Sequence, residues 1–257
     1  MGKKRGFSVI GIIPARFTSE RLPGKPLLKI GDKSMIEWVW RGAERALDNL
    51  YVATDDERIA SEVERFGGSA IITSAEHRTG TDRCAEALDL IESRCGENYD
   101  VVVNIQGDEP FTEVEQILSL TGCFSDEGTD IATLIRAVSR GEDISNTSQP
   151  KVVTDSYGYA LYFSRAAIPY VRDCRPKLWS SSHIFFKHVG MYAYRSNILR
   201  QITSLPPSPL EIAEGLEQNR WLENGLKIKT VQTPFGNIGV DTPEDLEEAR
   251  RIAAGGG

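Results

Sequence analysis

The chain has 257 residues, of which 26% are charged and 40% hydrophobic, the composition of a folded domain and not of a disordered or membrane protein. Its formal net charge of -7 argues against a protein that coats nucleic acid, because such proteins neutralise phosphates with many Lys and Arg side chains. No apolar run approaches the roughly 20 residues that span a bilayer, and the four cysteines show no C-x-x-C spacing. We therefore expect a cytoplasmic protein with reduced thiols, no membrane insertion and no nucleic-acid partner.

The first half of the chain alternates short apolar segments with helical segments, the pattern of βαβ units that build a parallel sheet. The apolar runs are nearly unbroken, as in strands buried on both faces, and cover residues 9–13, 50–53, 69–72 and 101–105. At several positions a Ser or Thr is followed three residues later by an acid, which is the spacing of a capping box. This spacing predicts helix starts at Ser34, Thr54, Ser208 and Thr242.

From about residue 128 the pattern changes to longer strands with Gly- and Pro-rich turns between them. These predicted strands cover residues 130–138, 159–163 and 185–194. We find no internal repeat, linker or low-complexity segment that would separate this half from the first. The sequence therefore predicts a single α/β domain over residues 1–257 with a mixed, mostly parallel central sheet.

The loop after the first strand, residues 14–26, carries three cations within ten residues: Arg16, Arg21 and Lys25. In open α/β sheets ligands bind at the carboxyl ends of the strands, so this loop lies at the expected mouth of a site. Arg and Lys side chains at such a place can hold a triphosphate. A solvated charged loop is the alternative interpretation of the same residues.

Two acids are candidate ligands for Mg²⁺, which proteins often hold through one or two carboxylates while phosphates complete the coordination. Asp108 follows the fourth predicted strand, and Asp241 follows a strand-like run directly before a predicted helix. A turn without function is the alternative for Asp108, and a simple helix cap is the alternative for Asp241.

Two further segments could contact a ligand. In residues 77–83, backbone amides and hydroxyls around Gly80 could contact a base or sugar, although Thr81 could equally be the cap of the next helix. In residues 187–194, strand alternation places His188, Gly190 and Tyr192 on one face. They could line a sugar pocket that Gly190 lets a ligand approach closely, or the His and Tyr could be core residues.

Motifs of several other enzyme classes are missing from the sequence. We find no G-x-x-x-x-G-K-[ST], no G-x-G-x-x-G after the first strand, no H-E-x-x-H and no G-x-S-x-G. P-loop kinases, Rossmann dehydrogenases, zincins and common esterases are therefore disfavoured.

The chain as a whole resembles the Kdo (3-deoxy-manno-octulosonate) cytidylyltransferases, or CMP-Kdo synthetases, within the nucleotide-sugar pyrophosphorylase superfamily. The matching segments follow one another over nearly the whole chain: 12–16, 21–27, 52–55, 80–83, 106–110, 159–165, 188–192 and 239–245. The resemblance implies one Rossmann-like, three-layer domain that acts as a homodimer. Residues 7–128 would bind the nucleotide, and residues 129–252 would bind the sugar and form the dimer.

The implied reaction converts CTP and Kdo to CMP-Kdo and pyrophosphate for lipopolysaccharide synthesis, by Mg²⁺-assisted in-line attack of the anomeric hydroxyl on the α-phosphorus. The implied nucleotide-binding residues are Pro14, Ala15, Arg16, Lys25, Arg78, Thr79, Gly80 and Gln106. The implied sugar-binding residues are Gln106, Arg165, His188, Tyr192, Glu217 and Gln218. The resemblance also implies Asp108 and Asp241 as Mg²⁺ ligands, and Arg16, Lys25 and Asp108 as the catalytic residues.

Two departures and several rival interpretations remain open. Glu20 stands where relatives usually carry a small Ser or Thr, which brings a negative charge close to the expected triphosphate, and the Ser-rich stretch Trp179–Ser182 matches no known segment. The substrate could be 8-amino-Kdo or a nine-carbon sialic-type acid, although Pro26 favours Kdo. A catalytically silent nucleotide-binding relative is the rival of a different class; the retained pair Asp108 and Asp241 argues against it.

Overall fold

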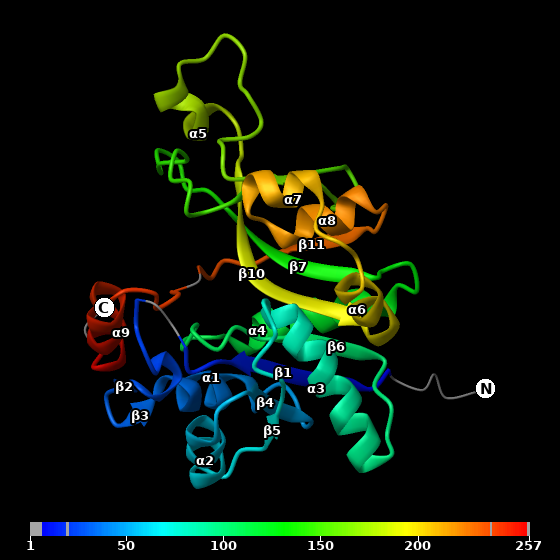
Figure 1. Ribbon diagram of the computed structural model, residues 1–257. Helices are drawn as coiled ribbons and strands as arrows, with labels where there is room; N and C mark the ends of the chain where they lie inside the picture. The colour runs from blue at the N-terminus through cyan, green and yellow to red at the C-terminus, as the bar shows by residue number, and fades with distance from the viewer. Residues whose placement is uncertain (1–6, 19–20, 237, 256–257) are drawn as a thin grey trace, which may run out of the picture.

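Nine strands form one twisted sheet with helices on both faces in the computed structural model, which describes residues 7–18, 21–236 and 238–255 (Figure 1). Seven strands follow the order β11-β7-β10-β6-β1-β4-β5, and β8 joins β10 to β9. Their bounds are β1 Val9–Ala15, β4 Leu50–Thr54, β5 Ala70–Ile72, β6 Val101–Asn104, β7 Ile131–Ala137, β8 Lys151–Thr154, β9 Ala160–Ser164, β10 Phe186–Arg195 and β11 Ile228–Gln232. A two-stranded sheet pairs β2 (Lys29–Ile30) with β3 (Lys33–Ser34).

Strand direction divides the sheet into two regions that meet at β10. β1 pairs in parallel with β4 and with β6, and β4 with β5, as βαβ units require. β10 runs antiparallel to both β6 and β7, while β11 returns parallel to β7. The predicted α/β fold with a mixed, mostly parallel sheet is therefore confirmed.

Helices cover the two faces of this sheet and complete three layers. α1, α2 and α4 pack on one face, whereas α3, α6 and α8 pack on the other. The helices are α1 Met35–Ala43, α2 Glu57–Arg65, α3 Gly80–Cys95, α4 Val114–Gly122, α5 Trp179–Ser182, α6 Ser196–Thr203, α7 Pro209–Glu214, α8 Glu217–Glu223 and α9 Pro243–Ala253. Among the described residues no helix is both long and apolar enough to cross a membrane.

The predicted strands are confirmed, with boundaries that move by one or two residues, but β2, β3, β8 and β11 were not foreseen. Three of the four helix starts are right. Ser208 and Thr242 each form a complete capping box, and Ser34 is the N-cap residue of α1 but makes no capping hydrogen bond. The fourth is wrong, because Asp56 caps α2 in place of Thr54.

The C-terminal helix returns to the N-terminal part of the chain. Leu246 and Ala249 of α9 pack with Ile30 of β2 and Met35 of α1 in a small buried cluster, and α9 lies beside β2 in Figure 1. Arg250 reinforces this packing because its Nε donates to the carbonyl of Lys29 (3.0 Å). The packing fixes the segment before α9, which carries Asp241, against the first loop.

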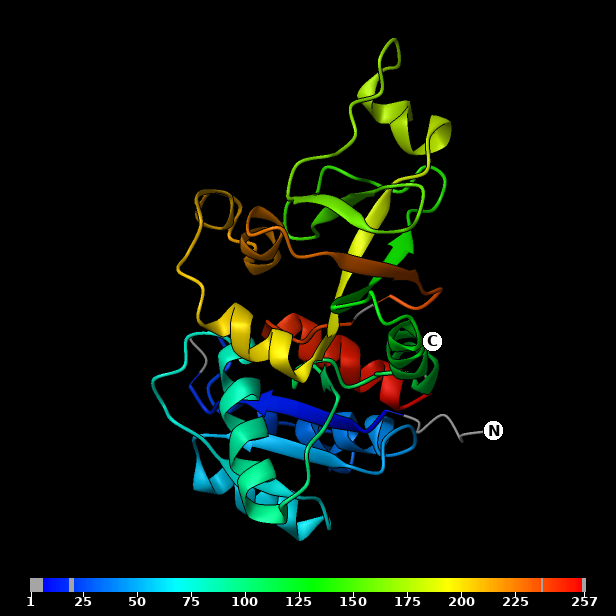
Figure 2. The ribbon, with the colours of Figure 1, turned by 90° about the vertical axis from the view of Figure 1, so that its right-hand side faces the viewer.

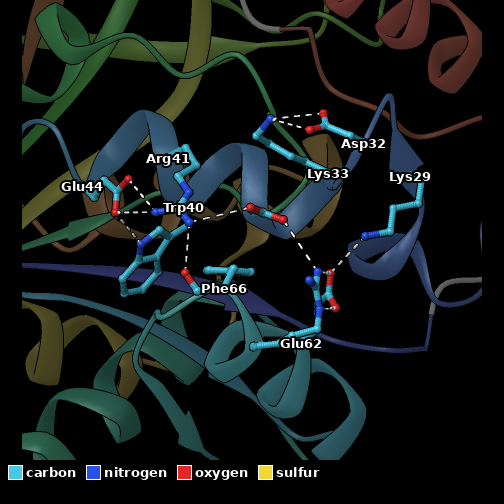
Figure 3. Close-up of polar contacts among 10 residues, drawn as sticks. Lys29, Asp32, Lys33, Trp40, Arg41, Glu44, Glu62 and Phe66 are labelled. Carbon is cyan, nitrogen blue, oxygen red and sulfur yellow. Dashed lines mark hydrogen bonds and ion pairs between the residues drawn. The ribbon is translucent and has the colours of Figure 1, made fainter.

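Ion pairs join α2 to the β2–β3 hairpin and to α1 (Figure 3). The carboxylate of Glu62 accepts from both Arg65, at 2.8 Å, and Lys29, at 3.4 Å. Its hydrogen bonds to Arg65 are the main reason why the pKa of Glu62 falls to about 2. On α1, Arg41 reaches both Glu44 (3.0 Å) and the carbonyl of Phe66 at the end of α2 (3.0 Å).

The segment that carries α5 projects from the opposite end of the molecule from α2 in both views (Figures 1 and 2). A small core of its own supports it, in which Trp179 and Phe185 stack with their ring centroids 6.3 Å apart. The Ser-rich stretch thus forms the short helix α5, away from the central sheet. All four cysteines are free thiols, as expected.

Candidate functional site

A cavity of about 860 Å³ opens where β1 and β6 end, on the side of the sheet towards which β1 runs in Figure 1. β1 and β6 are parallel neighbours, so the loops that follow them meet at one edge. Eighteen residues line the cavity: Pro14, Ala15, Arg16, Phe17, Thr18, Arg21, Pro23, Lys25, Pro26, His77, Arg78, Thr79, Gly80, Arg83, Gln106, Gly107, Asp108 and Asp241. Every residue that was assigned to the nucleotide, and both assigned to Mg²⁺, lies on this one cavity.

The backbones of three segments pack closely around the floor of the cavity. A Cβ atom at Gly107 would stand only 2.7 Å from the carbonyl oxygen of Pro14, and one at Gly80 would stand 3.1 Å from the Pro14 ring. Thr79, and not Thr81, caps α3, because its Oγ1 accepts from the amide of Asp82 (3.1 Å). The positive end of a four-turn helix therefore faces the cavity, where it favours an anion.

Phe17 anchors the loop after β1. The guanidinium of Arg58 on α2 lies 3.4 Å from the centroid of its ring, a cation–π contact. On the other side, Gly24 approaches the same ring and adopts a φ of +68°, a conformation that a larger residue would enter only with strain. The amide of Gly24 also donates to the carbonyl of Phe17 (3.0 Å), which closes the base of the loop. Glu20 lies outside the described residues.

One ammonium group joins the two candidate metal ligands. Lys25 Nζ donates to Asp108 Oδ2 (2.7 Å) and to Asp241 Oδ1 (3.0 Å), and Arg21 adds an ion pair to the other oxygen of Asp241 (3.2 Å). Burial alone would lower the pKa of Lys25, but the two carboxylates outweigh it, so that the pKa is raised above its ordinary value. Lys25 is therefore a fixed positive charge at neutral pH.

These two carboxylates fit a divalent ion that also binds phosphates. Asp108 and Asp241 come from segments far apart in the sequence and converge on one cation, and the amide of Val240 donates to the carbonyl of Asp108 (3.0 Å). No group of three or more His, Cys, Asp or Glu side chains forms a metal cage within the described ranges. Two carboxylates with room for phosphate oxygens is the arrangement typical of Mg²⁺. We expected a strand-like run before Asp241, but residues 238–240 are irregular.

Several cavity residues were not assigned a role from the sequence. Arg83, only 3% exposed, donates to the Thr73 hydroxyl (2.7 Å) and pairs with Asp55 (3.3 Å), which fixes the loop before α3. His77 contacts Glu86 on α3 (2.5 Å). The position of Arg83 in the Gly-Thr-Asp-Arg segment was the available signal, but nothing in the sequence indicated that its guanidinium is buried.

Of the residues expected to bind the sugar, only Gln106 lines this cavity. Gln106 donates to the carbonyl of Gly190 on β10 (3.1 Å), so it links the cavity to the second half of the sheet. His188 and Tyr192 share one face of β10, as expected, with their rings 5.3 Å apart. Burial lowers the pKa of His188 to about 4, so the ring is neutral at pH 7, and its Nε2 lies 3.0 Å from the hydroxyl of Thr133.

Arg165, Glu217 and Gln218 do not line the cavity either. Arg165, directly after β9, donates to the carbonyls of Glu214 (2.6 Å), Gly215 (3.2 Å) and Thr147 (3.0 Å), so it links the end of α7 to the loop around residue 147. Glu217 accepts from the hydroxyl of Thr81 (2.8 Å), which ties α8 to the start of α3, and burial raises its pKa. Its neighbour Gln218 is buried. The predicted sugar set is thus spread over the ends of β6 and β9, strand β10 and helix α8.

Comparison with known proteins gives concordant results. A family model described as "Cytidylyltransferase" matches residues 10–228. A 3-deoxy-manno-octulosonate cytidylyltransferase from Parabacteroides distasonis is 52% identical over 95% of this chain and 98% of its own length. The protein of the same name from Bacteroides thetaiotaomicron is 48% identical over 95% of this chain and 97% of its own length.

Solved structures extend the comparison to the fold. A CMP:2-keto-3-deoxy-manno-octonic acid synthetase complexed with CTP superposes with a TM-score of 0.87 at 39% identity, over 96% of this chain and 99% of that one. A cytidylyltransferase from Leptospira borgpetersenii, 17% identical over 96% of this chain and 87% of its own, has a TM-score of 0.61 and shares the fold.

Proposed function

The chain belongs to the 3-deoxy-manno-octulosonate cytidylyltransferase family, and we propose that its reaction takes place in the cavity at the carboxyl ends of β1 and β6. This reaction transfers CMP from CTP to Kdo and releases pyrophosphate. The observation that carries the proposal is the convergence of Arg16, Arg21 and Lys25 with Asp108 and Asp241 on one cavity. Cations and paired carboxylates together suit a nucleoside triphosphate and its metal ion.

In the proposed mechanism the anomeric hydroxyl of Kdo attacks the α-phosphorus of CTP in line with the leaving pyrophosphate. A bond forms between the sugar oxygen and the α-phosphorus, the hydroxyl proton passes to solvent, and the bond from that phosphorus to the α,β-bridging oxygen breaks. The reaction requires no covalent intermediate on the protein. Alignment of the reactants and stabilisation of charge therefore supply the rate.

The residues of the first loop perform the electrostatic part of this work. Arg16 and Lys25 hold the triphosphate, and the capped start of α3 at Thr79 and Gly80 adds oriented amides beside it. Pro14, Ala15 and Arg78 complete the nucleotide side. Because Phe17 fixes the loop on α2, the main chain that carries Arg16 and Lys25 is positioned before the nucleotide binds, which lowers the cost of organising the loop.

Asp108 and Asp241 are the proposed ligands of Mg²⁺, which when bound would neutralise phosphate charge and orient the α-phosphoryl group. Their placement by Val240 and α9 keeps both carboxylates directed into the cavity. The apolar packing of α9 with Leu22 and Ile30 holds this segment in place. The chain thus brings one acid from each half of its length to the reacting phosphate.

On the sugar side, Gln106, His188 and Tyr192 form the proposed contact surface. A neutral His188 exchanges hydrogen bonds with sugar hydroxyls and supplies no charge to the carboxylate. Arg165 would meet the carboxylate with the two N–H groups that its three hydrogen bonds to described residues do not use. Glu217 and Gln218 of α8 would border the pocket.

We further propose that the enzyme works in the cytoplasm as a homodimer and that its product feeds lipopolysaccharide synthesis, in accordance with the family resemblance. These three points are inferences from relationship. The rival acceptors 8-amino-Kdo and a sialic-type acid are compared with Kdo in the same assay.

The test of the proposed function is pyrophosphate release from CTP and Mg²⁺ with Kdo, beside 8-amino-Kdo, N-acetylneuraminate, no sugar, and UTP in place of CTP. Release that requires both CTP and Kdo supports the proposal. Release only with another acid would keep the chemistry but move the substrate. No release with any acid, despite binding of CTP, would favour the non-catalytic relative.

A further inference from the structure

The carboxylates proposed to bind the metal are already engaged by a cation of the protein. Lys25 Nζ lies 2.7 Å from Asp108 Oδ2 and 3.0 Å from Asp241 Oδ1. Its side chain is 15% exposed, whereas those of Asp108 and Asp241 are 33% and 50% exposed. The ammonium is thus the inner partner of the three groups, and Arg21 supports it from the more exposed side of Asp241.

An ammonium between these two oxygens competes with a divalent ion for the same position. Mg²⁺ binds carboxylate oxygens at about 2.1 Å, so it would stand in the space through which Lys25 now donates its hydrogen bonds. Two positive charges at such a separation also repel each other strongly in a partly buried site. We propose that Lys25 and the metal exchange: metal binding to Asp108 and Asp241 displaces the Lys25 ammonium, which is thereby released to bind the triphosphate. This inference rests on the proposed use of Mg²⁺.

The backbone around Lys25 allows such an exchange without refolding. Lys25 begins the short 3-10 helix Lys25–Leu27, with its amide bonded to the carbonyl of Leu22 (3.1 Å) and its carbonyl bonded to the amide of Leu28 (3.1 Å). The main chain is therefore held on both sides, and only the flexible four-carbon side chain needs to rotate. Before substrate arrives, Lys25 neutralises two neighbouring acids; after the metal arrives, the same charge serves the nucleotide.

The exchange predicts that removal of the positive charge of Lys25 strengthens metal binding. Mn²⁺ affinity without nucleotide would be measured by electron paramagnetic resonance for the wild type, Lys25→Met and, as a second neutral form, Lys25→Gln. We expect both variants to bind Mn²⁺ at least about tenfold more tightly than the wild type, which corresponds to about 1.4 kcal/mol. Circular dichroism and thermal unfolding would verify that each variant is folded.

Matched arginine variants separate direct competition from a general charge effect. Arg21→Met removes a cation that pairs with Asp241 but not with Asp108, and Arg16→Met removes one that lines the same cavity without an ion pair to either acid. Competition predicts a small gain for Arg21→Met and almost none for Arg16→Met. An equal gain in all three would overturn the exchange, because it would reflect net charge alone.

CTP binding provides the second arm. Lys25→Met should weaken CTP binding in the presence of metal while it strengthens binding of the metal alone. If neither Lys25 variant binds Mn²⁺ better than the wild type, the exchange is wrong. The double variant Asp108→Asn with Asp241→Asn tests the metal site itself: unchanged Mn²⁺ binding there would reject the proposed Mg²⁺ ligands, whereas lost binding together with unaltered affinity in Lys25→Met would reject the exchange alone.

Discussion

Replacement of Gly107 by alanine tests whether the close approach of the two loops sets the geometry of the site. The new Cβ would lie 2.7 Å from the carbonyl oxygen of Pro14, whereas ordinary contact begins at 3.4 Å. Both atoms belong to or directly extend the main chain, so the loops that carry Arg16 and Asp108 must separate by roughly half an ångström or more. Overpacking of this kind costs about 1–3 kcal/mol, or about 2–10 °C in Tm for a chain of this length.

The effect on catalysis should be larger than the effect on stability. A misplacement of about 1 Å can cost a factor of about 100 in rate, so we expect kcat/KM for CTP to fall about 10- to 100-fold at 25 °C, where the variant remains folded. Gly239→Ala is the matched control, because that Cβ would meet nothing within 4 Å although it lies close to Asp241. Activity of Gly107→Ala within twofold of the wild type, or an equal loss in Gly239→Ala, would refute the reasoning.

Three further predictions concern single residues. Asp108→Ala should lower turnover by at least about 100-fold with an unchanged circular dichroism spectrum; a near-normal rate would reject its role at the metal. Phe17→Leu removes the ring that Arg58 covers at 3.4 Å and should raise KM for CTP severalfold with little change in kcat, whereas Phe17→Tyr should stay close to the wild type; equal KM values would exclude the anchoring role. His188 has a folded pKa of about 4 against about 6.5 in the unfolded chain, so below pH 6.5 the unfolded chain takes up a proton that the folded chain does not. The free energy of unfolding should therefore fall by about 2 kcal/mol between pH 7 and pH 5. Urea titrations of His188→Gln should show a smaller change in this free energy over the same pH range. An equal change in the variant and the wild type would contradict burial of the neutral ring.

The sequence indicated which segments meet at the cavity because these segments are marked by local features. Residues 14–26 and 104–110 directly follow short apolar strands, and the carboxyl ends of neighbouring parallel strands meet by the geometry of the fold. Thr79 and Gly80 lie at a helix start for the same reason. In each case the motif lies at the end of a strand or the start of a helix, so its position along the chain was sufficient to place it at this edge of the sheet.

Long-range packing decided what the sequence could not show. Asp241 reaches Lys25 only because α9 packs on the β2–β3 hairpin. Similarly, the three carbonyls that Arg165 binds come from two segments, one 18 and the other 49 to 50 residues away. Strand β11 was missed because its residues Ile228–Gln232 alternate between buried and partly exposed over a short length, a weak pattern beside the apolar strands of the first half.

The most direct test of the central claim is ³¹P nuclear magnetic resonance of a mixture of CTP, Kdo, Mg²⁺ and the wild-type protein, run beside the Asp108→Ala variant. The account predicts that the CTP signals disappear with equal formation of one CMP ester of the sugar and of pyrophosphate, at a rate at least about 100-fold lower in the variant. Hydrolysis of CTP without ester formation, or equal rates in the two proteins, would contradict it.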